Sequence, residues 1–160
     1  MEPFEYRLEL LKWELDSIES SIRKIDDLGN STKNWAIITW IGAITVLMRE
    51  PPLHKVIYIT ALPPLLFMLV DAHWRSIQRM FMFRMNKISD FMNSTDFDKA
   101  CSEKDLSNFY VLDPISRKDK GREELHNYIA LKRILRYPTV SMLYIGQALL
   151  SIIIWAMINA

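Results

Sequence analysis

Cysteine, glycine and histidine are all scarce in this chain of 160 residues, which contains one cysteine, four glycines and three histidines. The single cysteine, Cys101, excludes an intramolecular disulfide and a cysteine cluster, and it suits a reducing compartment for the soluble part. The sequence has no glycine-rich phosphate loop and no serine nucleophile elbow. His54, His73 and His126 lie in three different regions, and none has a second ligand at the spacing of a helical metal site. The sequence therefore predicts no catalytic residue, no bound metal and no cofactor.

Charge is absent from three apolar stretches of the chain. Residues 138–160 contain no charged side chain, and these twenty-three residues exceed the ~20 that a spanning helix needs. Residues 56–70 are also uncharged, and residues 35–48 form a shorter apolar run. With their flanking residues, these stretches predict three transmembrane helices, at 31–49, 53–74 and 138–160. The predicted fold class is an all-α membrane protein.

Residues 1–30 carry a heptad pattern of apolar side chains over about three repeats. The residues of this seam are Phe4, Leu8, Leu11, Leu15, Ile18, Ile22 and Ile25. The pattern predicts a cytosolic, amphipathic, coiled-coil-like helix over residues 3–28, ended by Gly29 and Asn30. The seam needs a partner, which is either the same helix in other subunits or the run that follows Trp74. Because this acidic start lacks the features of a secretory signal, we expect no cleaved signal.

The second span is expected to continue into the cytosol as one helix over residues 56–92. Inside it, Pro63 and Pro64 remove two backbone donors and predict a kink, which is either the hinge of a gate or a fixed packing feature. Residues 75–137 are expected to form cytosolic helices and a long polar loop. The apolar cluster 109–112 in that loop is either a short strand or a plug against the helices.

Lysine and arginine near the ends of the spans predict their orientation. Thirteen of these residues precede the first span, follow the second or precede the third, whereas Arg49 and Lys55 lie in the hairpin loop between the first two spans. We therefore expect the N-terminus in the cytosol, the hairpin loop outside and the C-terminus at the outer face.

Asp71 is the ionisable residue that lies deepest in an apolar run, and such residues are candidates for function. It lies near the expected cytosolic interface, where Arg75 one turn later would form an ion pair with it. His73 beside it would add sensitivity to pH. A structural ion pair and a gating role at a pore mouth both stay open. The gating candidates are Asp71, His73, Arg75, Pro63 and Pro64.

Polar residues follow one side of the third span, and in lipid such a stripe must face protein or water. They are Ser141, Tyr144, Gln147, Ser151 and Asn159. Packing between helices is one interpretation. The other is a hydrated pore lined by Gln147 and Ser151, with Thr39 and Thr45 from the first span. Because three spans cannot enclose a conduit, such a pore requires a homo-oligomer.

Basic and aromatic residues alternate after the second span, and a second basic cluster follows in the loop. The basic candidates are Arg75, Arg79, Arg84, Lys87, Arg117, Lys118 and Lys120. Such side chains contact anionic lipid headgroups just below a membrane. They also bind a nucleotide or a short nucleic acid, through phosphate charge and ring stacking. Both interpretations stay open.

The layout is an amphipathic arm, a span that opens at Asn34-Trp35, a short hairpin, a span that ends in Asp71, Trp74 and Arg75, and a long cytosolic helix. It resembles small bacterial membrane effectors of the SLATT type, and also the channel-like effectors of the Hailong defence systems. The resemblance covers most of the chain, although the third span departs from the two-span SLATT form. It implies an oligomeric bacterial inner-membrane channel that depolarises an infected cell under the control of a nucleotide or oligonucleotide from a partner nucleotidyltransferase. The rival expectation is a non-conducting membrane anchor or scaffold for a cytosolic partner.

Overall fold

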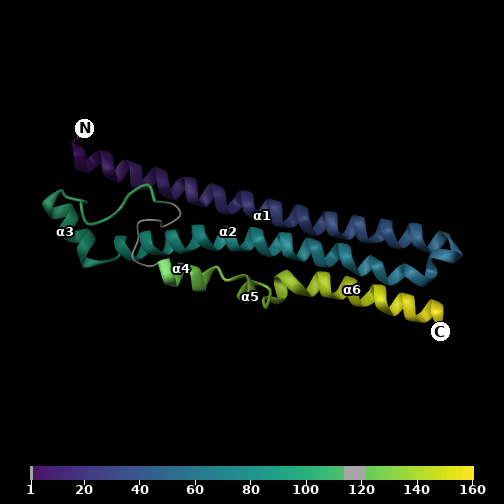
Figure 1. Ribbon diagram of the computed structural model, residues 1–160. Coiled ribbons are helices and arrows are strands. Elements are labelled where there is room, and N and C mark those ends of the chain that lie inside the picture. Colours follow the sequence, from purple (N-terminus) through teal and green to yellow (C-terminus); the bar gives the residue numbers. More distant parts are fainter. Residues whose placement is uncertain (1, 114–121) are drawn as a thin grey trace. The chain divides into compact units, whose positions relative to one another are not determined.

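The computed structural model describes residues 2–113 and 122–160. Within those ranges the chain is helical and contains no strand (Figure 1). Its elements in order are α1 (Pro3–Arg49), the 3-10 helix η1 (Pro51–Ala61), α2 (Leu62–Met92), α3 (Thr95–Glu103), α4 (Arg122–Tyr128), α5 (Leu131–Ile134) and α6 (Pro138–Asn159). The helical fold class is thereby confirmed.

The chain divides into two compact units, and both α1 and α2 contribute to each of them. Unit 1 consists of Met1–Asp26 and Ser76–Ala130. Unit 2 consists of Asp27–Arg75 and Leu131–Ala160. Unit 2 therefore holds η1, α5, α6 and all three predicted spans, whereas unit 1 holds most of the basic and aromatic run.

α1 is one continuous helix of 47 residues, so the predicted end of the helix at Gly29 is wrong. Its buried positions recur at helical spacing along one side. They are Leu11, Glu14, Ile18, Ile25, Thr32, Ala36 and Ile44. Gly29 is buried as well, and a Cβ atom there would lie 3.3 Å from Asp71 Oδ1. The glycine therefore makes room for the close approach of α2 and does not end the helix.

The second apolar stretch changes its helical type instead of forming the single α-helix that was predicted. η1 is wound as a 3-10 helix and ends at Ala61, and α2 begins at the next residue. Pro63 and Pro64 are consequently the second and third residues of α2, in the first turn, where a missing N–H group is tolerated. The effect of the proline pair is thus a change of winding immediately before it.

The heptad seam of α1 packs against the same chain in unit 1. The buried cluster is Leu11, Ile18 and Ile88, with Leu15, Ile22, Phe81, Met85, Phe109 and Val111 packed against it. Of the two partners considered for the seam, the structure therefore shows the run that follows Trp74 in the same chain. Two residues of the cluster 109–112 lie against the helices as a plug. Phe109 and Val111 pack on the buried cluster, and Phe109 stacks on Phe91 with their ring centroids 4.1 Å apart. Tyr110 and Leu112 are exposed.

α3 lies in what the sequence indicated was a polar loop. Ser94 precedes it, and Asp96 and Asp98 lie in its first turn, where negative charge is favourable. It ends at Glu103, and the next residue, Lys104, has a left-handed φ of 52°. The sequence signals for this helix are the Ser-Thr-Asp start and the apolar Phe97 and Ala100 at a spacing of three.

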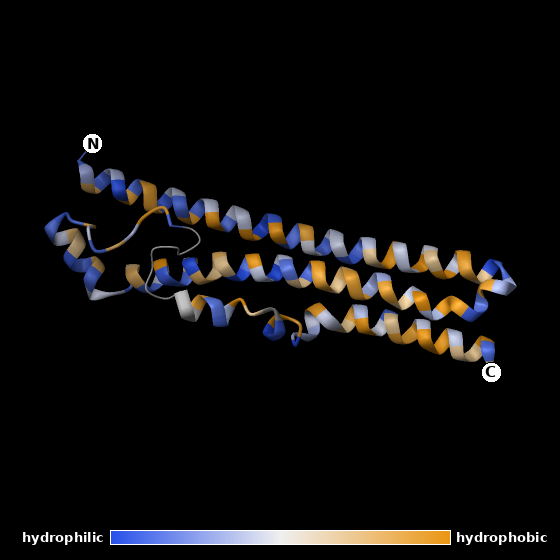
Figure 2. Cartoon of the chain, viewed as in Figure 1, coloured by the Kyte–Doolittle hydropathy of each residue, from blue (hydrophilic) through white to orange (hydrophobic). Residues whose placement is uncertain are grey.

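Apolar residues dominate η1, the beginning of α2 and α6 (Figure 2). In the part of the chain that the structure describes, two stretches of helix are long and apolar enough to cross a membrane, Pro51–Met92 and Leu125–Asn159. They contain the second and third predicted spans. The predicted span at 31–49 lies in α1 and is not among these two stretches.

Candidate functional site

Asp71 is a carboxylate of unit 2 whose side chain is fully shielded from solvent. α1, α2 and α6 each contribute a residue to this site. Lys33 Nζ lies 3.9 Å from Asp71 Oδ2, and the Tyr144 hydroxyl donates a hydrogen bond of 3.1 Å to the same oxygen. Asp71 is therefore anchored by a cation from α1 and by a hydroxyl from α6. Arg75 lies one turn further along the same helix.

A second polar cluster of unit 2 centres on Ser151, which is also fully buried. Trp40 Nε1 donates to its Oγ at 2.8 Å, and the Thr60 hydroxyl lies 2.9 Å from the same atom. Ser151 in turn donates to the backbone oxygen of Gln147 at 3.1 Å. These bonds link α6 to α1 and to η1, in the interior of unit 2.

The polar row of α6 continues to the end of the helix. Trp155 Nε1 donates to the backbone oxygen of Lys55 at 2.9 Å, and Asn159 Nδ2 donates to that of His54 at 3.4 Å. We call Tyr144, Gln147, Ser151, Trp155 and Asn159 the polar row. Its fifteen-residue reach corresponds to about 22 Å along the helix axis. Most of this row is bonded to other helices of the same chain, as the packing interpretation of the stripe requires.

Two buried side-chain oxygens of unit 2 lack the hydrogen bonds that the other polar groups make. Asp71 Oδ1 and Gln147 Oε1 are buried and accept no hydrogen bond within the described part of the chain. Gln147 as a whole is 5% exposed, so its amide is shielded as well. An acceptor buried without a donor costs about 1–3 kcal/mol, and such atoms in a native structure call for an explanation.

The other pore and gate candidates are scattered over unit 2. Thr45 is exposed and donates to the backbone oxygen of Ile41. His73 is exposed beside the ring of Trp74, at a centroid distance of 5.9 Å. Pro64 is buried in the unit, whereas Thr39 and Pro63 line an apolar groove.

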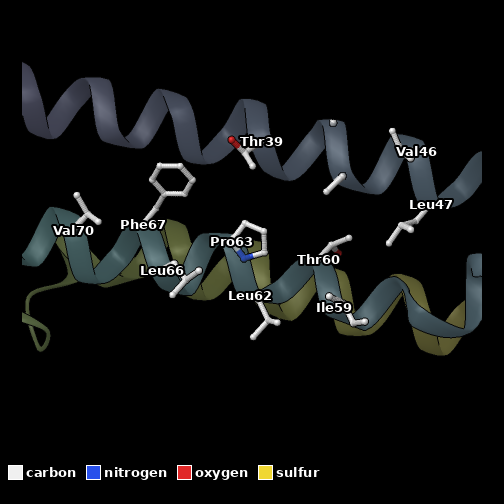
Figure 3. Close-up of a pocket in the computed structure, with 12 residues that line it drawn as sticks. Thr39, Val46, Leu47, Ile59, Thr60, Leu62, Pro63, Leu66, Phe67 and Val70 are labelled. Carbon is white, nitrogen blue, oxygen red and sulfur yellow. The ribbon is translucent and has the colours of Figure 1, made fainter.

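That groove has a volume of about 900 Å³ and lies between α1 and the junction of η1 with α2 (Figure 3). Its twelve lining residues are Thr39, Gly42, Ala43, Val46, Leu47, Ile59, Thr60, Leu62, Pro63, Leu66, Phe67 and Val70. No charged side chain is among them. Sequence reasoning missed this groove, because it is formed by two segments whose packing no periodicity shows.

Arg84, predicted to bind a ligand, is instead buried in unit 1. It is 2% exposed, and its Nε and Nη2 donate to the two carboxylate oxygens of Glu14 at 2.9 and 3.2 Å. Its Nη2 also donates to the backbone oxygen of Tyr110. The backbone amides of Leu112 and Asp113 donate to Glu14 at 2.7 and 3.1 Å. The Glu14 and Arg84 pair thus secures the 109–113 segment and leaves no side of this guanidinium for an external phosphate.

Arg79 and Lys87 lie together on one face of α2 in unit 1, with Phe83 between them. The Arg79 guanidinium is 4.1 Å from the centroid of the Tyr128 ring, and Lys87 Nζ is 4.8 Å from that of Phe83. Ser76 Oγ donates to the backbone oxygen of Ile129 and so holds the end of α4 near this face. We call Arg79, Phe83, Lys87 and Tyr128 the basic aromatic face.

The remaining candidates of the basic loop, Arg117, Lys118 and Lys120, lie outside the described residues. Across residues 2–113 and 122–160, no three His, Cys, Asp or Glu side chains come together in a way that would hold a metal ion. Comparisons with protein-family models, with curated proteins and with solved structures find no match for the chain. Its function is therefore inferred from its own residues.

Proposed function

We propose that unit 2 is embedded in a bacterial inner membrane and that unit 1 lies in the cytosol. The distribution of apolar side chains supports this placement. Only 17% of the most apolar window in Pro51–Met92 and 22% of that in Leu125–Asn159 is buried inside the chain, whereas the core helix of a soluble protein would be mostly buried. Trp35, Ile38 and Val46 are each about 60% exposed, which supports a further crossing by α1. Unit 2 would thus have an apolar exterior, and its interior would contain polar side chains beside an apolar core.

Within this placement, the chain acts as a gated ion channel. The observation that carries this proposal is the pair of buried oxygens, Asp71 Oδ1 and Gln147 Oε1, that lack a hydrogen-bond donor in the described residues. Buried polar groups that served packing alone would all be satisfied, because an unsatisfied acceptor is costly where water is excluded. Acceptor oxygens held ready along a spanning helix are the groups that water or a cation uses when a path opens.

Asp71 is the proposed gate of this channel. It connects α1, α2 and α6 through Lys33, its own helix and Tyr144, so its rearrangement would loosen three helices at once. Three helices cannot enclose a wide conduit, so the open state would be a homo-oligomer whose polar rows turn toward a shared axis.

The basic aromatic face is the proposed entry point of the signal. Cations beside aromatic rings suit a nucleotide or oligonucleotide, whose phosphates pair with the cations and whose bases stack on the rings. Arg79 and Lys87 keep this role, whereas Arg84 does not. A partner nucleotidyltransferase would supply the ligand in an anti-phage response, in which the open channel depolarises the infected cell.

A second candidate function is a non-conducting membrane anchor. It is favoured by the intrachain packing of the heptad seam, which occupies the surface that would otherwise join subunits in unit 1. In that case unit 1 would present its face to a cytosolic partner, and the polar row would only hold the helices of unit 2 together.

Conductance of the purified protein in planar bilayers separates the two candidates. Gln147→Leu removes an unsatisfied acceptor from the polar row, so we expect single-channel steps to shrink or vanish. The matched control is Met142→Leu, because Met142 is 74% exposed on the opposite side of α6. A wild-type protein that never conducts, with or without nucleotides at the cytosolic side, would exclude the channel and leave the anchor.

A further inference from the structure

The two carboxylate oxygens of Asp71 have unequal partners. Oδ2 accepts the hydrogen bond of the Tyr144 hydroxyl at 3.1 Å and lies 3.9 Å from Lys33 Nζ. Oδ1 accepts no hydrogen bond from the described residues, although the Asp71 side chain is fully buried. A buried carboxylate oxygen in this state is costly, because it has lost the hydrogen bonds that water gives it in the unfolded chain. A further donor is therefore expected beside Oδ1.

Gly29 of α1 leaves room beside this oxygen. A Cβ atom at that glycine would lie 3.3 Å from Asp71 Oδ1 and 3.8 Å from Arg75 Nη2. Apart from its chain neighbours and the backbone of its own helix, it would meet no other atom of the described residues within 4 Å. Gly29 is itself buried. The absent side chain thus leaves a shielded space that a carboxylate oxygen and a guanidinium nitrogen both border.

Charge and hydrogen bonding decide what fits this space. Lys33 and Arg75 already bring two positive charges to the single negative charge of Asp71, so a further cation would be repelled. An anion would lie against the carboxylate oxygen and be repelled as well. A water molecule is neutral, and it both donates to an oxygen such as Oδ1 and accepts from a guanidinium N–H group. Its radius of about 1.4 Å is also similar to that of the missing methyl group.

We propose that a water molecule is bound over Gly29 and bridges Asp71 Oδ1 and Arg75 Nη2. Buried waters that bond to two or more otherwise unsatisfied groups are part of a protein structure and are costly to remove. The inference deepens the proposed gate, and its consequence for conduction rests on that proposed function. A path that opens at Asp71 would begin from a position that is already hydrated while the channel is closed. Gly29 is the residue that keeps this position open.

The scarcity of glycine allows a direct test, because labelling with glycine that carries carbon-13 at Cα marks only four residues. Magnetisation transfer from water to the labelled Hα protons is measured by NOESY for the full chain in detergent micelles. A water held over Gly29 gives transfer to its Hα protons, whereas a surface water leaves too quickly to do so. We expect transfer at Gly29 and none above the noise at Gly42 and Gly146, where an added Cβ atom would meet no atom within 4 Å.

Two variants of Gly29 test the same position through stability. Gly29→Ala places a methyl group in the space and offers no donor, whereas Gly29→Ser adds a hydroxyl that can donate to Asp71 Oδ1 in place of the water. Alanine is the better helix former, so helix propensity alone would make Gly29→Ala the more stable variant. We expect the opposite order in a denaturant titration, with an unfolding constant about tenfold lower for Gly29→Ser than for Gly29→Ala.

Gly42→Ala and Gly42→Ser are the matched controls for this pair. Gly42 lies in the same helix, and an added Cβ atom there meets no atom within 4 Å and so no unsatisfied oxygen. Helix propensity should therefore decide the order, with Gly42→Ala the more stable of the two.

Three results would overturn the bound water. One is the absence of transfer at Gly29 in a wild type whose circular dichroism shows its helices formed. Another is equal transfer at Gly29, Gly42 and Gly146, which would show general access of water. The third is a Gly29→Ala variant that is more stable than Gly29→Ser, as at Gly42. Conductance tests the channel separately. A protein that holds the water and never conducts would refute the channel, whereas one that conducts without transfer at Gly29 would refute the water alone.

Discussion

Glu14 and Arg84 form the buried ion pair of unit 1, and Glu14→Gln tests whether that pair holds the 109–113 segment in place. The Glu14 carboxylate accepts two hydrogen bonds from Arg84 and one each from the amides of Leu112 and Asp113. Leu112 has a φ of 62°, an uncommon conformation for a leucine, so its local geometry depends on such contacts. The substitution preserves the shape of the side chain and removes its charge.

The expected cost follows from the burial of both partners, which are each 2% exposed. Removal of one partner from a buried pair costs about 3–5 kcal/mol, because the other charge is left uncompensated. Since glutamine keeps one acceptor oxygen and Arg84 keeps the backbone oxygen of Tyr110, we expect the lower value, about 3 kcal/mol. At 1.4 kcal/mol per factor of ten, local opening would become roughly 100-fold more frequent.

Hydrogen exchange measures this opening directly. In Glu14→Gln, the amides of Leu112 and Asp113 should exchange roughly 100-fold faster than in the wild type. Glu19→Gln is the matched control, because Glu19 pairs with Arg23 at 3.4 Å on the surface, where the side chains are 60% and 71% exposed. Such a pair contributes about 0.5 kcal/mol or less.

Glu14→Leu combined with Arg84→Met is the second comparison. Replacement of both charges by apolar groups of similar size should recover the part of the global unfolding free energy that Glu14→Leu alone loses by leaving the Arg84 charge uncompensated. The amides of Leu112 and Asp113 would still lack their acceptor. The reasoning would be refuted if Glu14→Gln changed exchange no more than Glu19→Gln.

The remaining predictions concern unit 2 and the α3 region. Ser151→Ala removes the acceptor of the partly buried Trp40 indole N–H, and should lower the unfolding free energy by about 1–3 kcal/mol in a denaturant titration followed by tryptophan fluorescence. Tyr144→Phe removes one hydrogen bond from the Asp71 carboxylate and should cost about 1.5–3 kcal/mol, so a variant as stable as the wild type would contradict the assigned contact. The Ser107 hydroxyl and amide bonds hold the pKa of Asp105 below its ordinary 3.8, with a smaller contribution from Arg7. Because the pKa is depressed, the stabilisation is present above the unfolded value and is lost as pH falls through the folded one. An NMR titration should show Ser107→Ala raising that pKa toward 3.8.

Local patterns predicted most of the helices correctly. The apolar spacing of residues 3–28 predicted a helix and its buried side, and the uncharged run at 138–160 predicted α6. The helix boundaries were predicted incorrectly where a residue type occurs in more than one structural context. Gly29 is a common helix terminator, but here it lies in the middle of α1 because Asp71 passes close to it. Pro63 and Pro64 disturb an α-helix from within, yet they occupy its first turn when the preceding residues wind as a 3-10 helix.

The residues of the candidate sites were also predicted in part: the sequence identified several of them, but not their contacts. Asp71, Gln147 and Ser151 were identified from the sequence, because polar groups in apolar runs are costly and stand out by composition alone. The sequence did not show that Lys33 faces Asp71, or that Trp40 donates to Ser151 across 111 positions. It also did not distinguish Arg84 from Arg79 and Lys87, since all three follow the same spacing of basic and aromatic residues.

The sequence by itself determined that the chain is helical, that it carries long apolar stretches, and where its polar exceptions lie. These features depend on side-chain chemistry and on the 3.6-residue period, both of which are local. Only the tertiary structure decided which helix the seam contacts, which arginine is buried and where a groove opens. Such outcomes depend on the approach of residues far apart in the chain, and hydrophobic burial, which drives that approach, specifies no particular partner.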